Sequence, residues 1–102
     1  MRGDMADPPS IMVQRTDVEQ FLSRFTVHVT DDAGTSTHTV TLSGADWERL
    51  GKPFHSPDDL VRASFAYLLA REPKEQILAS FDLGQISTYF PGWDRELAPP
   101  RS

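Results

Sequence analysis

The chain has 102 residues, of which 38% are hydrophobic and 25% charged, and it carries a formal net charge of −5 and no cysteine. This length fits one domain with a modest core, and the missing cysteines exclude a disulfide framework and thiolate metal sites. No apolar run approaches the ~20 residues of a membrane span and no signal-peptide pattern is present, so we expect a soluble protein without membrane association.

The first 10 residues are polar, contain prolines and lack periodicity, and a disordered leader is predicted over residues 1–15. After it, Thr16 and Glu19 have the spacing of a capping box and apolar residues recur at helical intervals. The same segment also fits an early part of the next strand. Residues 16–24 are therefore predicted as either a short helix or a strand.

A β-hairpin is predicted over about residues 24–42, because apolar and polar residues alternate on both sides of the turn Asp31-Asp32-Ala33-Gly34. The expected cross-strand pairs are Phe25 with Leu42, Val27 with Val40, and Val29 with His38. This register gathers the apolar side chains on one face and leaves the other face to threonines and His28. Two strands alone are marginally stable, so helices or a second hairpin must cover the apolar face.

Helix signals follow in close succession. Ser43 is expected to cap a short helix that Gly51 ends in a left-handed conformation. Ser56 then caps the main helix, which starts at Pro57, places two acids in its first turn and buries one broad stripe. The expected members of that stripe are Leu60, Val61, Ser64, Phe65, Leu68 and Leu69.

Beyond the main helix, Pro73 should break it and open a second, turn-rich helix that runs to Phe81. Asp82 and Gln85 form a capping box for a third helix, with Leu83, Ile86, Tyr89 and Phe90 on its core face. Pro91 and Gly92 end this helix, and Trp93 is expected to fold back into the core.

The prediction is thus a single α+β domain over residues 16–93, in which an antiparallel β-hairpin packs against three or four short C-terminal helices within residues 56–91. A frayed tail is expected over residues 94–102.

The run SFAYLLAREPKEQIL, followed by FDLGQISTYFP, resembles the C-terminal signature of a family of small uncharacterised bacterial proteins, many from actinobacteria. A similar SF.FLL.REP...IL..FDL..I..YFP pattern recurs in that family, and the match covers roughly residues 56–91. The resemblance implies a bacterial, cytoplasmic origin and a fold shared with small α+β relatives. It carries over no catalytic or binding residue, because the function of the family is unknown.

Several residue groups could have a chemical role, but a structural role accounts for each of them better. In the expected register His28 and His38 lie on opposite faces and cannot share a metal ion, and His55 stands just outside a helix cap. The Asp32-Ala33-Gly34-Thr35 sequence is similar to an aspartic-protease loop, but a hairpin turn accounts for it. Asp58 and Asp59 suit the first turn of a helix. We expect no metal and no cofactor.

We therefore expect a non-catalytic protein-interaction module that associates with itself or with a protein partner. The candidate partner-binding residues are Arg71, Glu72 and Lys74 around the helix break, together with Tyr89. The alternative is a small enzyme or ligand-binding protein with a polar cleft between hairpin and helices. That cleft would use His28 or His38, Asp58, Arg71 and Tyr89. Nucleic-acid binding ranks third, because its basic stripe would need Arg62, Arg71 and Lys74 in a chain with more acids than bases.

Overall fold

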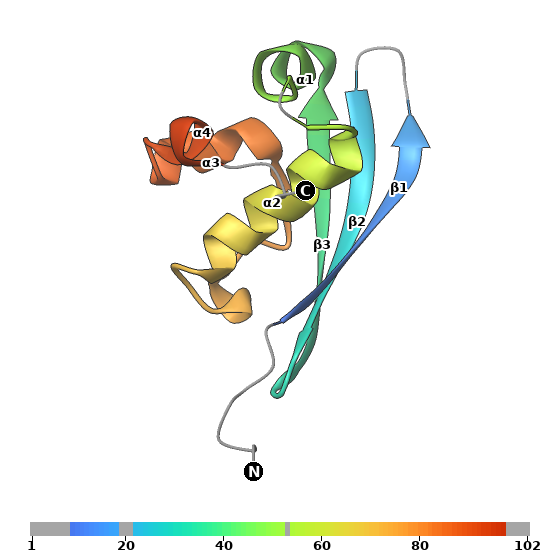
Figure 1. Cartoon of the computed structure of the whole chain (residues 1–102). Helices are drawn as coiled ribbons and strands as arrows, with labels where there is room; N and C mark the ends of the chain where they lie inside the picture. Colours follow the sequence, from blue (N-terminus) through green and yellow to red (C-terminus); the bar gives the residue numbers. More distant parts are fainter. Residues whose placement is uncertain (1–8, 19–21, 53, 98–102) are drawn as a thin grey trace.

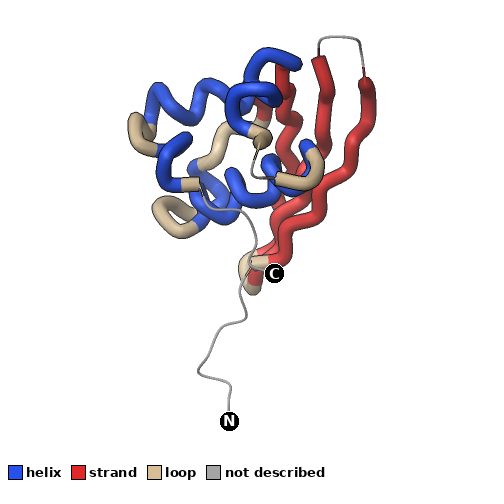
Figure 2. Tube along the Cα trace, turned by 45° about the horizontal axis from the view of Figure 1, so that its top comes forward, coloured by secondary structure: helices blue, strands red, loops and turns tan. Residues whose placement is uncertain are grey.

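The structure is a computed structural model that describes residues 9–18, 22–52 and 54–97. The strands among these residues are β1 (Ser10–Val18), β2 (Leu22–Asp31), β3 (Gly34–Ser43) and β4 (Ser80–Asp82). The helices are α1 (Gly44–Leu50), α2 (Pro57–Leu69), α3 (Ile86–Tyr89) and α4 (Trp93–Glu96), with 3-10 turns η1 (Lys74–Gln76) and η2 (Leu83–Gln85). One mixed sheet has the order β1-β2-β3-β4, in which only the β3–β4 pair is parallel. The described helices lie over one face of this sheet (Figure 1 and Figure 2), which gives a two-layer α+β fold.

The hairpin of β2 and β3 has the predicted faces, but its register differs from the predicted one by two residues. Phe25 pairs with Val40 and Val27 with His38. The turn is tighter than expected: the Ala33 amide donates to Asp31 Oδ1 at 2.8 Å, and Gly34 follows with a φ of +132°. An even shift leaves every side chain on its face, so the alternation of apolar residues could not distinguish the two registers.

The prediction of a disordered leader is wrong for residues 10–15, which belong to β1. Ile11 pairs with Val29 and Val13 with Val27, and both β1 side chains pack partly buried against the core. Of the two alternatives predicted for residues 16–24, the strand forms where the chain is described and the helix does not, because β1 runs to Val18 and β2 begins at residue 22. Pairing along the whole strand outweighs a local capping pattern. Residues 1–8 and 19–21 lie outside the described residues.

The main helix α2 confirms its predicted start and its buried stripe. The Ser56 hydroxyl accepts from the Asp59 amide at 3.3 Å, and Pro57 occupies the first turn. The buried residues of this helix are Leu60, Val61, Ser64, Phe65 and Leu68. The four apolar residues among them meet the sheet residues Phe25, Val27, Val29, Val40 and Leu42 in one core cluster. Leu69 is only half-buried, at the margin of the stripe.

Helix α1 also starts as predicted, since the Ser43 hydroxyl accepts from the Asp46 amide at 3.1 Å. Its predicted left-handed stop is wrong: Gly51 has a φ of −87°, which is ordinary right-handed backbone. The need for glycine here is steric. A Cβ at Gly51 would overlap the ring of Trp47, which lies directly against the backbone.

The second helix predicted from Pro73 to Phe81 is wrong. Only the single turn η1 forms, and the chain then extends into β4, where Phe81 lies opposite Val40 of β3. The Thr39 amide donates to the Ala79 carbonyl at 2.8 Å, just before the strand. Hydrogen bonding to the uncovered edge of β3 thus replaces a helix that only local spacing favoured.

The C-terminal segment confirms the predicted capping box. The Asp82 amide donates to Gln85 Oε1 at 2.8 Å, and Asp82 Oδ1 accepts from the Gly84 amide at 3.0 Å. Trp93 is completely buried, as predicted. The frayed tail is wrong for residues 94–96, which form α4 with Trp93, while residues 98–102 lie outside the described residues.

Candidate functional site

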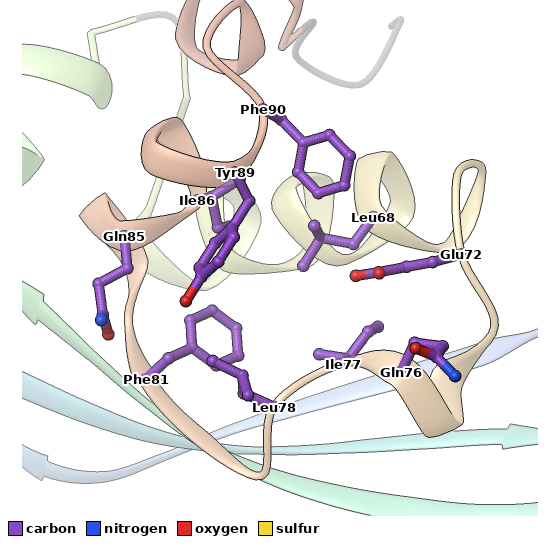
Figure 3. Close-up of a pocket in the computed structure, with 10 residues that line it drawn as sticks. All are labelled: Leu68, Glu72, Gln76, Ile77, Leu78, Phe81, Gln85, Ile86, Tyr89 and Phe90. Carbon is purple, nitrogen blue, oxygen red and sulfur yellow. The ribbon is translucent and has the colours of Figure 1, made fainter.

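An open groove of about 310 Å³ lies in the helical layer, between the end of α2, the segment that leads into β4, and α3. Its lining is mainly apolar, and Figure 3 shows these side chains gathered around one opening. The apolar residues are Leu68, Ile77, Leu78, Phe81, Ile86, Tyr89 and Phe90. The polar residues are Glu72, Gln76 and Gln85.

Two large side chains of the groove are exposed to solvent. Leu78 is 49% and Tyr89 is 62% exposed, whereas the neighbouring Ile77 and Ile86 are buried in the core. In Figure 3 the Tyr89 ring stands at the opening, beside Leu78 and Phe81. Exposed large apolar residues that lie next to one another around a concavity are typical of binding surfaces.

The carboxylate of Glu72 is directed into this groove (Figure 3). Among residues 9–18, 22–52 and 54–97 it forms neither an ion pair nor a side-chain hydrogen bond. Its immediate surroundings include Leu68 and Ile77. A partly buried carboxylate beside apolar groups favours a cation that would pair with it.

An ion cluster fixes the wall of the groove that carries η1. Lys74 is only 4% exposed, and its ammonium contacts the carboxylates of Asp31, at the hairpin tip, and Glu75. Hydrogen bonding to Glu75 and then to Asp31 raises the pKa of Lys74 above its ordinary value of 10.5. The Lys74 ammonium lowers the pKa values of both carboxyl groups. The corner after α2 is thereby tied to the sheet.

A buried histidine holds the next part of the same wall. His38 Nδ1 lies 2.8 Å from the Leu78 carbonyl oxygen, and His38 Nε2 lies 2.8 Å from the Ser36 hydroxyl. Since a carbonyl only accepts, Nδ1 carries the proton and donates, and in the neutral ring Nε2 accepts from Ser36. The His38 ring also packs on Phe65 with centroids 5.4 Å apart. His38 therefore positions the backbone from which Leu78 projects.

The four predicted partner-binding residues separate into two pairs. Glu72 and Tyr89 both line the groove. Arg71 instead forms an ion pair with Glu96 at 2.9 Å and stacks over the Tyr67 ring at 3.5 Å, which joins α2 to α4. Lys74 is enclosed by its carboxylates. Both cations of the predicted charged corner are thus occupied in internal contacts.

Leu78 is a groove residue whose role the sequence prediction missed. The Ile77-Leu78 dipeptide could have indicated an exposed apolar side chain, because two adjacent residues of an extended segment cannot both face the core. That signal was hidden by the prediction of a helix, in which Ile77, Leu78 and Phe81 share one face.

The groups of the alternative polar cleft do not converge. His28 contacts Thr37 on the sheet face away from the helices, while His38 lies in the core. Asp58 pairs with Arg15 at 2.8 Å. Of the five candidate groups only Tyr89 lines the groove, so this arrangement offers no support for acid–base chemistry there.

The basic residues considered for nucleic-acid binding form no stripe. Arg62 lies 3.7 Å from Asp59, and Arg71 and Lys74 pair with the acids described above. The described residues contain no group of three or more histidine, aspartate or glutamate side chains arranged to hold a metal ion. In the same part of the chain no helix is long and apolar enough to cross a membrane.

Comparison of the chain with protein-family models, curated proteins and solved structures finds no match. The resemblance of residues 56–91 to a small bacterial family therefore stays a prediction, and the geometry of the groove is the basis for a functional proposal.

Proposed function

We propose that the protein is a non-catalytic interaction module whose groove binds a segment of a partner protein, in which a large apolar side chain stands next to a lysine or arginine. The observation that carries this proposal is the Glu72 carboxylate, which faces an apolar groove without an ion-pair partner among the described residues. A basic group beside an apolar anchor satisfies both parts of such a surface at once. The family resemblance supports a bacterial, cytoplasmic setting for this interaction.

The apolar part of the groove contributes to binding through the burial of apolar surface. Leu78 and Tyr89 together present two large, half-exposed side chains that a partner would remove from water. Burial of apolar surface contributes about 25 cal/mol per Å², and Tyr is among the residues that carry most binding energy in interfaces. We therefore expect Tyr89 to be the residue of this chain on which affinity depends most.

The size and rim of the groove favour a peptide segment over a compact small molecule. A volume of about 310 Å³ is at the lower end for enclosed ligand sites, and this groove is open to solvent. Gln76 and Gln85 add amide groups at its rim. Amides can hydrogen-bond to the main chain of a docked segment, which a small apolar ligand does not offer.

The test is selection from a displayed library of random peptides against the purified chain. We expect the selected peptides to share one aromatic or branched aliphatic residue beside a lysine or arginine. Glu72→Gln keeps the shape of the side chain and should remove the preference for the basic residue. Tyr89→Ser should reduce the affinity of the selected peptides about tenfold or more.

Two matched variants serve as controls. Glu48→Gln changes an exposed acid on α1, and Met12→Ser removes an exposed apolar side chain from β1, on the sheet. Both should bind the selected peptides as the unchanged protein does. Selection of acidic peptides, or equal loss of affinity in Met12→Ser and Tyr89→Ser, would contradict the proposal.

A further inference from the structure

The lining of the groove is suited to a proline-rich segment that carries a basic residue. Three aromatic rings line it, those of Phe81, Tyr89 and Phe90, and the Glu72 carboxylate lies to one side of them (Figure 3). Segments with consecutive prolines dock in aromatic-lined grooves, because their backbone is already restricted and loses little entropy on binding. A lysine or arginine next to the prolines would pair with Glu72.

The chain itself contains such a segment. Its sequence has two Pro-Pro pairs. Pro8-Pro9 follows Asp7, whose charge would be repelled by the Glu72 carboxylate. Pro99-Pro100 is instead followed by Arg101, whose charge complements that of Glu72. Charge therefore selects the segment after α4 over the segment before β1.

Helix α4 ends beside the groove. It lies next to α3, which forms one wall of the groove (Figure 1). Glu96, the last residue of α4, pairs with Arg71 at 2.9 Å, and Glu72 directly follows Arg71 in the chain. Tyr67 joins the same places, since its hydroxyl donates to Glu96 and its ring meets the ring of Phe90, with centroids 6.0 Å apart. The chain thus leaves α4 near the side of the groove that carries Glu72.

The length of chain after α4 is sufficient to reach the groove. Leu97 is packed against the core, and its amide donates to the Trp93 carbonyl at 2.9 Å. Arg101 comes four residues later, and four extended residues span about 13 Å. Because Leu97 directly follows the residue that contacts Arg71, this span brings the Arg101 guanidinium within reach of the Glu72 carboxylate.

We infer that the Pro99-Pro100-Arg101 segment occupies the groove of its own chain, with Arg101 paired to Glu72, and that a partner must displace it. This inference rests on the proposed function of the groove and adds a competing ligand within the same chain. A segment on a short tether has an effective concentration in the millimolar range. A contact with an intrinsic dissociation constant of about 1 mM would then lower the affinity for a partner about two- to tenfold.

Paramagnetic broadening of nuclear magnetic resonance signals tests the contact directly. Because the chain has no cysteine, Ser102→Cys provides a single site for a spin label. In the isotope-labelled, spin-labelled protein we expect broadening of the amide signals of Leu78, Tyr89 and Phe90. His28, on the sheet face away from the helices, should keep its signal.

Variants of the two charges show whether this broadening reports the proposed ion pair. Arg101→Gln should remove most of the broadening, and the charge exchange Glu72→Arg/Arg101→Glu should restore it. Arg95→Gln removes an exposed cation of α4 itself and should leave the broadening unchanged. Each of these variants also carries the spin label at residue 102.

Peptide affinity separates this inference from the proposed function. The peptides selected in the test above should bind Arg101→Gln about two- to tenfold more tightly than the unchanged protein, because the competing segment is weakened. Equal affinity would overturn the inference and leave the proposed function intact. Selection of no peptide by either protein would count against the proposed function, whereas broadening that depends on Arg101 would still support the contact.

Two resonance results would also overturn the inference. The first is equal broadening in the Ser102→Cys protein with and without Arg101→Gln. The second is broadening in a mixture of spin-labelled chains and separate isotope-labelled chains, which would place the segment in the groove of a second copy.

Discussion

The ammonium of Lys74 lies 2.9 Å from Asp31 Oδ1, so the corner after the main helix is joined to the tip of the hairpin by a buried cation. Glu75 contacts the same ammonium from the other side. Because Gln76 of η1 and Ile77 directly after it form one wall of the groove, this cluster connects the shape of the binding surface to the position of the sheet.

The first prediction concerns pH. The pKa values of Asp31 and Glu75 lie below their ordinary 3.8 and 4.5, and the pKa of Lys74 lies above 10.5. The two carboxylates therefore stabilise the fold at pH values above these ordinary pKa values. This contribution to stability is lost as the pH falls through the lowered pKa values of the folded state. The contribution of Lys74 to stability is complete below pH 10.5 and is lost as the pH rises through the raised pKa of Lys74 in the folded state.

Asp31→Asn should accordingly be less stable than the unchanged protein near neutral pH and should lose less stability on acidification below about pH 4. Urea unfolding measured at a series of pH values provides the comparison. Asp32→Asn, at the neighbouring exposed turn position, is the control and should follow the unchanged protein. Identical pH dependence of Asp31→Asn and the unchanged protein would show that the cluster does not contribute.

The second prediction concerns the end of α1. A Cβ at Gly51 would overlap the Trp47 ring, so Gly51→Ala should destabilise the protein by about 1–3 kcal/mol. In a Trp47→Ala background the same change should cost much less, because the ring that it meets is gone. The four free energies of unfolding form a double-mutant cycle. Additive losses would mean that glycine is needed there for another reason.

The third prediction concerns the wall of the groove. His38→Leu keeps an apolar contact with Phe65 but removes the donor to the Leu78 carbonyl, which should cost about 1–3 kcal/mol of stability. The same variant should also bind the selected peptides more weakly, because the segment that carries Leu78 loses its hydrogen bond to His38. His28→Leu, on the open sheet face, should change stability by less than about 0.5 kcal/mol and leave peptide binding intact.

Where short-range chemistry decides the structure, the sequence was a good guide. Ser43, Ser56 and Asp82 each cap the turn that they were predicted to cap, because a cap depends on residues only two or three positions away. The alternation in β2 and β3 likewise predicted which side chains are buried.

Where pairing with a distant segment decides the structure, the predictions from the sequence were wrong or incomplete. Residues 80–82 form a strand only because the edge of β3 accepts them, and nothing in Ser80-Phe81-Asp82 by itself indicates a parallel partner. The burial of Lys74 depends on Asp31, more than 40 residues earlier in the chain. For the same reason Glu72 and Tyr89 were predicted among the candidate site residues, but the groove that brings them together was not.

The most direct test of the groove is a nuclear magnetic resonance titration of the isotope-labelled chain with a peptide from the selection. The proposal predicts chemical-shift changes centred on Leu78, Tyr89 and Phe90. With the unchanged protein, which keeps Glu72, these changes should be lost when the basic residue of the peptide is replaced by glutamine. Changes centred on the threonines of the sheet face, or equal binding of both peptides, would contradict it.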